Sequence, residues 1–139
     1  MHDDAVRHGG DASTGRGPRI HHLTLRVNDV ETSARFYERA LGVTVDVLED
    51  RSRFQVGDTI VVLRPPLSGT PAGDAFTERR IGLDHVAFHG RSESELGDLL
   101  RRLRDLGVDV GTIERDAATG GTGLAFRDPD NIQLEFYVP

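Results

Sequence analysis

Two stretches of the chain alternate between apolar and polar residues, which is the period of a β-strand with one buried face. The first stretch, residues 20–27, places Leu23, Leu25 and Val27 on one face and His22, Thr24 and Arg26 on the other. The second, residues 83–89, places Val86 and Phe88 on one face and His85, Ala87 and His89 on the other. In both predicted strands a histidine therefore lies on the polar face, opposite the aliphatic side chains.

An amphipathic helix is predicted after each of these strands. Apolar residues recur at three- and four-residue spacing between Asp29, a predicted N-cap, and Gly42, which stands where glycine often ends a helix. In the second half, Ser92 and Glu95 form a capping-box pair, and a stripe of leucines ends at Gly107. Both predicted helices have one apolar face that must pack against another element.

Three further short strands are predicted in each half. They cover residues 43–48, 51–56 and 59–64 in the first half, and residues 108–114, 121–127 and 132–138 in the second. The halves also align directly: HLTLRV and ALGVTV match HVAFHG and DLGVDV, and DTIVVLRPP (58–66) matches NIQLEFYVP (131–139). The pattern predicts an α+β fold of two tandem β-α-β-β-β modules, which form a curved, cup-shaped mixed sheet with the helices on its outer face.

The predicted domain begins after a polar, glycine-rich segment. Residues 1–18 contain no apolar cluster, so we expect a flexible tail, which holds His2 and His8. Residues 19–139 form a single predicted domain, with module one at about 20–64, a linker at 65–81 and module two at about 82–139. A linker of that length without a hydrophobic period is typical of a loop that flanks a binding site.

Composition narrows the range of partners. The formal net charge is −6 and basic residues are interleaved with acidic ones, so no coherent surface for nucleic acid is expected. The longest aliphatic run, residues 60–63, is far too short for a membrane span. The chain has no cysteine, which excludes disulfides and thiolate ligands, and its first residues lack the hydrophobic region of a signal peptide. We expect a cytoplasmic protein whose partner is a small molecule.

The polar strand faces carry a candidate metal site. His22 and His85 occupy matching positions in the two modules, and Glu135 lies on the corresponding face of the last predicted strand. Two imidazoles and one carboxylate bind ions such as Fe(II), Mn(II), Ni(II) or Zn(II) and leave coordination positions free for substrate oxygens. The spacing alone leaves open the alternative that the histidines are structural and the glutamate is solvated.

Three segments of the chain resemble the vicinal-oxygen-chelate (VOC) superfamily, which includes glyoxalases, bleomycin-resistance proteins and extradiol dioxygenases. The segments are HHLTLRVNDVETSARFYERALG (21–42), LDHVAF (83–88) and FRDPDNIQLEFY (126–137), in the order expected for the family. The resemblance covers nearly all of residues 20–139. It implies the cup-shaped two-module fold, a homodimer, and one divalent metal ion bound by His22, His85 and Glu135.

The chain departs from family members of known activity at several points. Glyoxalase I and methylmalonyl-CoA epimerase carry a further Glu or Gln where this chain has Val62, so both activities are disfavoured. Thr24 matches a threonine of the fosfomycin-resistance transferases, but the loop 116–123 lacks the cationic features of their potassium and thiol sites. Extradiol dioxygenases add an acid-base histidine and a tyrosine, and neither His89 nor Tyr137 can be assigned these roles.

The sequence therefore predicts a divalent-metal-dependent enzyme of the glyoxalase/dioxygenase type, a dioxygenase, lyase or group transferase, that acts on a small oxygenated substrate. The substrate-binding candidates are polar side chains on the same strand faces: Thr24, Arg26, Arg64, His89 and Tyr137. Arginine can hold a carboxylate or phosphate by two parallel hydrogen bonds. The alternatives are a metal-free drug- or metabolite-binding protein of the bleomycin-resistance type, and a glyoxalase-type isomerase. The complete ligand set and an aromatic content of only 6% favour the enzyme.

Overall fold

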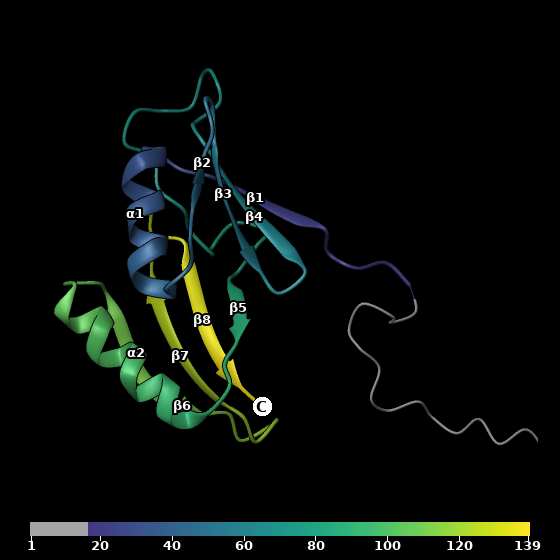
Figure 1. Cartoon of the computed structure of the whole chain (residues 1–139), viewed down its shortest axis with the longest axis vertical. Coiled ribbons are helices and arrows are strands. Elements are labelled where there is room, and N and C mark those ends of the chain that lie inside the picture. The colour runs from purple at the N-terminus through teal and green to yellow at the C-terminus, as the bar shows by residue number, and fades with distance from the viewer. Residues whose placement is uncertain (1–16) are drawn as a thin grey trace, which may run out of the picture.

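The computed structural model describes residues 17–139, which fold into two modules of the same element order (Figure 1). The first contains β1 (His22–Arg26), α1 (Val30–Leu41), β2 (Asp46–Val47), β3 (Ser52–Val56) and β4 (Thr59–Arg64). The second contains β5 (Val86–His89), α2 (Glu93–Asp105), β6 (Val110–Arg115), β7 (Thr122–Arg127) and β8 (Gln133–Val138). The predicted element order is confirmed. The predicted flexible tail lies outside the described residues except for Gly17 and Pro18.

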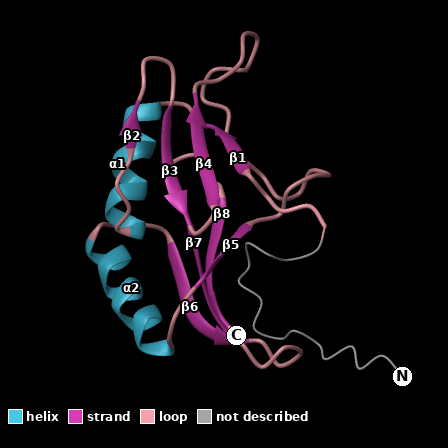
Figure 2. Cartoon of the chain, turned by 45° about the vertical axis from the view of Figure 1, so that its right-hand side comes forward, coloured by secondary structure: helices cyan, strands magenta, loops and turns pink. Residues whose placement is uncertain are grey.

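Each module forms its own four-stranded mixed sheet. The strand orders are β1-β4-β3-β2 and β5-β8-β7-β6. In each sheet the first strand of the module runs parallel to the strand that comes last in sequence, β1 to β4 and β5 to β8. The α+β class with two helices and two mixed sheets is confirmed, and both helices lie on one side of the strands (Figure 2). Within the described part of the chain the two sheets are not joined by strand pairing. Both β1 and β5 are therefore edge strands, and one chain does not form a continuous eight-stranded cup.

The strand register confirms the internal repeat. Thr24 pairs with Val62 in the first sheet, and Ala87 pairs with Glu135 in the second. In the alignment of the two halves Thr24 corresponds to Ala87 and Val62 to Glu135, so the two sheets pair these strands in the same register. Val62 therefore occupies, in the first module, the place that Glu135 occupies in the second.

Both helices begin and end as their sequences predict. The side chain of Asp29 accepts a hydrogen bond from the first turn of α1, and Gly42 ends that helix in the left-handed conformation at φ 68°. At the start of α2, the Ser92 hydroxyl accepts a hydrogen bond from the backbone of Glu95 at 3.3 Å. No helix among residues 17–139 is long and apolar enough to cross a membrane.

The largest difference from the predicted elements is the strand expected at residues 43–48. Only Asp46 and Val47 pair with β3. The backbone N–H of Val45 instead donates to the side chain of Glu38 at 3.4 Å. This contact keeps Val45 beside α1, and pairing with β3 therefore begins only at Asp46.

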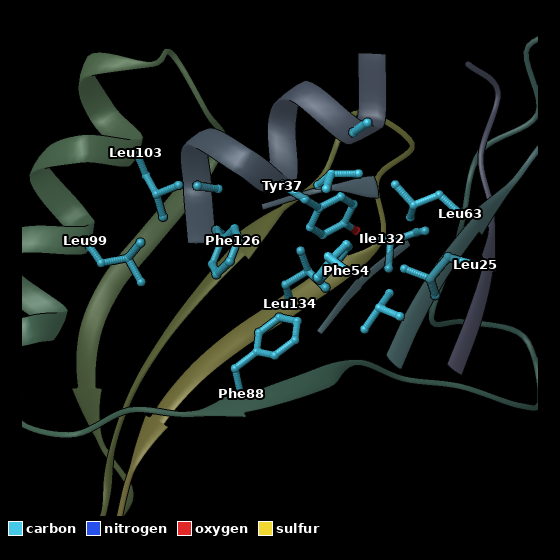
Figure 3. Packing of buried hydrophobic residues seen from close by; sticks show 14 of the residues in the cluster. Leu25, Tyr37, Phe54, Leu63, Phe88, Leu99, Leu103, Phe126, Ile132 and Leu134 are labelled. Carbon is cyan, nitrogen blue, oxygen red and sulfur yellow. The ribbon is translucent and has the colours of Figure 1, made fainter. Parts of the chain in front are cut away.

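The apolar faces of both sheets and both helices meet in one core (Figure 3). Helix α1 contributes to both modules. Tyr37 stacks on Phe54 of β3 with ring centroids 5.1 Å apart, and Phe36 contacts Phe126 of β7 with centroids 6.4 Å apart. Because the core is shared, neither module buries its apolar face alone. We call the opposite face of each sheet its open face. It carries His22, Thr24 and Arg26 of β1 in the first sheet, and Glu135 and Tyr137 of β8 in the second.

The turn before β8 places two buried carboxylates between the modules. Asp128 and Asp130 are only 6% and 7% exposed. Asp128 accepts a hydrogen bond from the hydroxyl of Tyr37 at 2.7 Å, and Asp130 accepts two from Asn28, at 2.6 and 3.0 Å. Burial raises the pKa of Asp128, and burial together with that carboxylate raises the pKa of Tyr37. The first module thus supplies donors that the carboxylates of the second module need.

The linker is attached to both modules. The side chain of Asn28 donates to the carbonyl of Asp74 at 2.7 Å. Arg127 of β7 forms two hydrogen bonds with the carboxylate of Glu78, at 2.9 and 3.0 Å. The linker therefore runs along a defined path between the end of β1 and the second module.

Replacing Tyr37 with Phe should lower the free energy of unfolding by about 1–3 kcal/mol, because it removes a donor from a buried carboxylate. Tyr137→Phe is the matched control, since the hydroxyl of Tyr137 lies in an exposed contact with Thr119. Its effect should stay below about 0.5 kcal/mol. Urea unfolding measures both variants, and equal effects would contradict the role of the Tyr37–Asp128 contact.

The Glu78–Arg127 pair predicts a defined pH dependence. Hydrogen bonding to Arg127 lowers the pKa of Glu78 from 4.5 to about 2. Because the pKa is lower in the folded state, the pair's contribution to stability is complete above pH 4.5 and is lost as the pH falls from 4.5 toward 2. The difference in unfolding free energy between the wild type and Glu78→Gln should shrink over that interval. Chemical denaturation at several pH values measures this difference, and a constant value throughout would refute the assignment.

Candidate functional site

His85 and Glu135 come together on the open face of the second sheet. His85 immediately precedes β5, and Glu135 lies in the neighbouring parallel strand β8. The Nε2 atom of His85 is 3.2 Å from the Oε2 atom of Glu135, and the two side chains are 38% and 25% exposed. An imidazole nitrogen and a carboxylate oxygen therefore meet at a point that a ligand can reach.

A second carboxylate sets the orientation of His85. The Nδ1 atom of His85 is 2.6 Å from the Oδ1 atom of Asp84. In the tautomer whose Nδ1–H donates to Asp84, Nε2 can bind a cation that it shares with the carboxylate of Glu135. Metal-binding histidines commonly have such a partner on their other nitrogen. Asp84 is not among the site residues predicted from the sequence, although its position directly before a candidate ligand could have pointed to it.

Two glycines of the β7 region make room for the side chains of β8. A Cβ atom at Gly123 would overlap the Oε1 atom of Glu135, and one at Gly121 would overlap the ring of Tyr137. The hydroxyl of Tyr137 is in turn hydrogen-bonded to Thr119 in the loop before β7. Gly123 thus allows Glu135 to lie beside His85, a requirement that the sequence analysis missed.

His22 lies on the open face of the first sheet. Its Nδ1 atom is 3.0 Å from the Nδ1 atom of His21, so in both modules the preceding residue contacts Nδ1 of the candidate histidine. The residue that would match Glu135 beside it is Val62. Among residues 17–139 no three His, Asp or Glu side chains gather closely enough to hold a metal ion. One chain therefore brings together His85 and Glu135, and the predicted convergence with His22 is not seen within it.

The five substrate-binding candidates divide between the two sheets. Thr24 and Arg26 are exposed on β1, and Arg64 of β4 is the register partner of Arg26. His89 and Tyr137 are register partners in the second sheet, where His89 is exposed and Tyr137 is half-buried. Each sheet therefore presents one pair of hydrogen-bonding side chains in matching positions.

A cavity of about 320 Å³ lies beside β1. Thr24 and Arg26 contribute to its wall, whereas His85 and Glu135 do not. The end of β1, the linker and the turn before β8 form its lining, which comprises Thr24, Leu25, Arg26, Val27, Asn28, Pro66, Thr70, Asp74, Ala75, Phe76, Leu83, Asp130 and Ile132. The linker thus borders a cavity, and this cavity lies in a different region from the His85–Glu135 pair.

Comparison with known proteins places the chain in a family. The sequence model described as "Glyoxalase/Bleomycin resistance protein/Dioxygenase superfamily" matches residues 19–136. The chain is 29% identical to the uncharacterized protein YqjT of Bacillus subtilis, over 86% of the chain and 98% of YqjT. It is 30% identical to a glutathione transferase named FosA from Serratia marcescens, over 86% of the chain and 79% of that protein. A crystal structure of a glyoxylase/bleomycin resistance protein/dioxygenase domain from Frankia sp. EAN1pec superimposes with a TM-score of 0.74 and 32% identity, over 87% and 97% of the two chains.

Replacing Gly123 with Ala should move the Glu135 carboxylate away from His85. The overlapping atoms belong to the flexible end of a side chain, so the fold should be retained while affinity for Zn(II) falls about tenfold or more. Gly111→Ala in β6 is the matched control, because its Cβ would lie 3.5 Å from the carbonyl of Ala125, an ordinary contact. Calorimetric titration with Zn(II) compares the two variants. Equal affinities would show that Gly123 does not position a ligand.

Proposed function

The chain belongs to the glyoxalase/bleomycin resistance protein/dioxygenase superfamily, and we propose that it is a divalent-metal-dependent enzyme acting on a small oxygenated substrate. The ligands would be His22, His85 and Glu135. The observation that carries the proposal is the His85–Glu135 pair, with Asp84 on the outer nitrogen of the imidazole and Gly123 beneath the carboxylate. This donor set and the space left for it fit Fe(II), Mn(II), Ni(II) or Zn(II).

We propose further that the metal site is shared between two copies of the chain. His22 begins β1 and His85 directly precedes β5, and both strands are edge strands. Large apolar side chains are exposed just before them, at Ile20 and Leu83. A homodimer that places β1 of one copy beside β5 of the other would bury these residues and satisfy both edges. It would also carry His22 of one copy toward His85 and Glu135 of the other.

Three protein ligands leave coordination positions free for substrate oxygens, where the ion acts as a Lewis acid. The chain's own residues hold the imidazole and carboxylate in place and leave the open face accessible. Val62 supplies neither a fourth ligand nor a general base, which disfavours a glyoxalase-type isomerase. Among dioxygenase, lyase and group transferase, the similarity to a glutathione transferase named FosA supports group transfer.

A metal-free metabolite-binding protein is the second candidate function. The cavity of about 320 Å³ beside β1 supports it, because His85 and Glu135 do not line that cavity. Small-molecule sites are often cavities of at least this size. Metal content separates the two candidates, since only the enzyme needs the ion.

Replacing His85 or His22 with Ala should abolish stoichiometric metal retention while the fold is preserved. His89→Ala is the matched control, because His89 is the last residue of β5, the strand that His85 immediately precedes. Elemental analysis of protein purified without a histidine tag measures the metal content of all three variants. Unchanged metal in His85→Ala would refute the proposed ligand set, and wild-type protein without stoichiometric metal would favour the binding protein.

The same assay tests whether the site is shared. In a mixed dimer of His22→Ala and His85→Ala chains, one of the two sites keeps all three ligands. Random co-assembly should therefore restore about a quarter of the wild-type metal content, because about half of the dimers are mixed. A site formed within one chain would give no restoration.

A further inference from the structure

A second cavity lies between α1 and the hairpin formed by β2 and β3, on the helical side of the first sheet. Figures 1 and 2 show β2 beside this helix. The cavity has a volume of about 530 Å³, and neither His85 nor Glu135 contributes to its lining. It also shares no residue with the cavity beside β1. Cavities of this volume are typical of small-molecule sites.

Apolar side chains line both sides of this cavity. Val30 and Ala34 of α1 lie on one side, and Val47 and Leu48 of the hairpin lie on the other. Val47 and Leu48 are 78% and 43% exposed. Exposed apolar side chains that gather around a hollow mark binding sites. A ligand with an apolar body would remove these side chains from water, which stabilises the complex.

A buried hydroxyl at this cavity has no hydrogen-bond partner. Ser52 of β3 contributes to the lining and is only 1% exposed. Among residues 17–139, its hydroxyl is the one buried side-chain group that forms no hydrogen bond. Burial of a polar group without a partner costs free energy. Rotation about the Cα–Cβ bond moves the oxygen between three staggered positions, so a ligand in the cavity can supply the missing hydrogen bond.

The charged side chains around this cavity favour a cation. Four acidic and two basic residues contribute to the lining: Glu31, Glu38, Glu49, Asp50, Arg35 and Arg51. Each of the two arginines is already paired with one of the carboxylates, Arg35 with Glu31 and Arg51 with Asp50. Glu38 and Glu49 form no ion pair with any residue that the structure describes. A positive charge in the cavity is therefore attracted, and a negative charge is repelled.

We propose that this cavity binds a small amphiphilic amine, a molecule with an apolar body and one protonated amino group. The apolar body packs between α1 and the hairpin. The amino group donates a hydrogen bond to the hydroxyl of Ser52, and the carboxylates of Glu38 and Glu49 stabilise its charge. The cavity is separate from the proposed metal site, so this inference does not depend on the proposed function.

The test is a titration of the whole 139-residue chain with three probes of similar size and different charge. The probes are phenethylamine, phenethyl alcohol and hydrocinnamate, and the backbone amide signals in NMR spectra report their binding. Saturable shifts are expected in α1 and in the β2–β3 hairpin. Phenethylamine should bind most tightly and hydrocinnamate most weakly.

Variants of the lining separate the hydrogen bond from the charge. Ser52→Ala should weaken phenethylamine binding about tenfold. It should not lower the urea midpoint of unfolding, because the hydroxyl forms no hydrogen bond that unfolding would break. Glu49→Gln should weaken phenethylamine binding about threefold and leave the binding of phenethyl alcohol unchanged.

Ser33→Ala is the matched control for Ser52→Ala. Both serines are 1% exposed, but the hydroxyl of Ser33 donates to Asp130 at 3.4 Å. Ser33 does not line the cavity. The control should therefore lower the urea midpoint and leave the affinity for phenethylamine unchanged.

Several results would overturn the inference. One is the absence of saturable shifts with phenethylamine, and another is shifts confined to the cavity beside β1. Tighter binding of hydrocinnamate than of phenethylamine would refute the preference for a cation. Equal affinity of Ser52→Ala and the wild type would refute the role of the buried hydroxyl. The metal content of each variant is measured in parallel and should not change, because the cavity and the proposed metal site share no residue.

Discussion

The arrangement of the two modules depends on the buried contact between Tyr37 and Asp128. A carboxylate taken out of water is costly unless donors surround it. Asp128 obtains one donor from α1 of the first module and others from the backbone of its own turn. Asp130 obtains its donors from Asn28 at the end of β1. Since this turn leads directly into β8, the same contacts fix where Glu135 enters the open face.

The two modules share one backbone topology and differ in the side chains on their open faces. Their registers agree residue for residue, so that Thr24–Val62 and Ala87–Glu135 are equivalent pairs. The second module places a carboxylate next to its histidine and clears space for it with glycine. The first places valine there, and it has arginines at the next open-face positions of β1 and β4. A repeated scaffold can thus present a histidine–carboxylate pair on one sheet and arginines on the other without any change in topology.

Much of this fold could be predicted from the sequence because its signals are local. Period-two alternation locates β1 and β8. The helix caps at Asp29 and Gly42 lie where the residue types flanking the apolar helical period predict them. The internal repeat also predicted that His85 and Glu135 share a face, and the 3.2 Å contact is consistent with it. The separation of the sheets could not be predicted in this way, because alternation identifies the face of a strand and not its neighbour. The role of Gly123 depends on a diagonal contact between two strands, which only the register reveals.

The hydrogen bonds between the modules also constrain how the chain acquires its structure. Tyr37 and Asp128 are 91 residues apart, and Asn28 and Asp130 are 102 apart. While the chain emerges from the ribosome, the first module cannot complete its interior until nearly the last strand has been synthesised. Contacts of such long range close late and slow the search for the native topology. The two halves, although they repeat one pattern, should therefore fold as a single cooperative unit rather than one after the other.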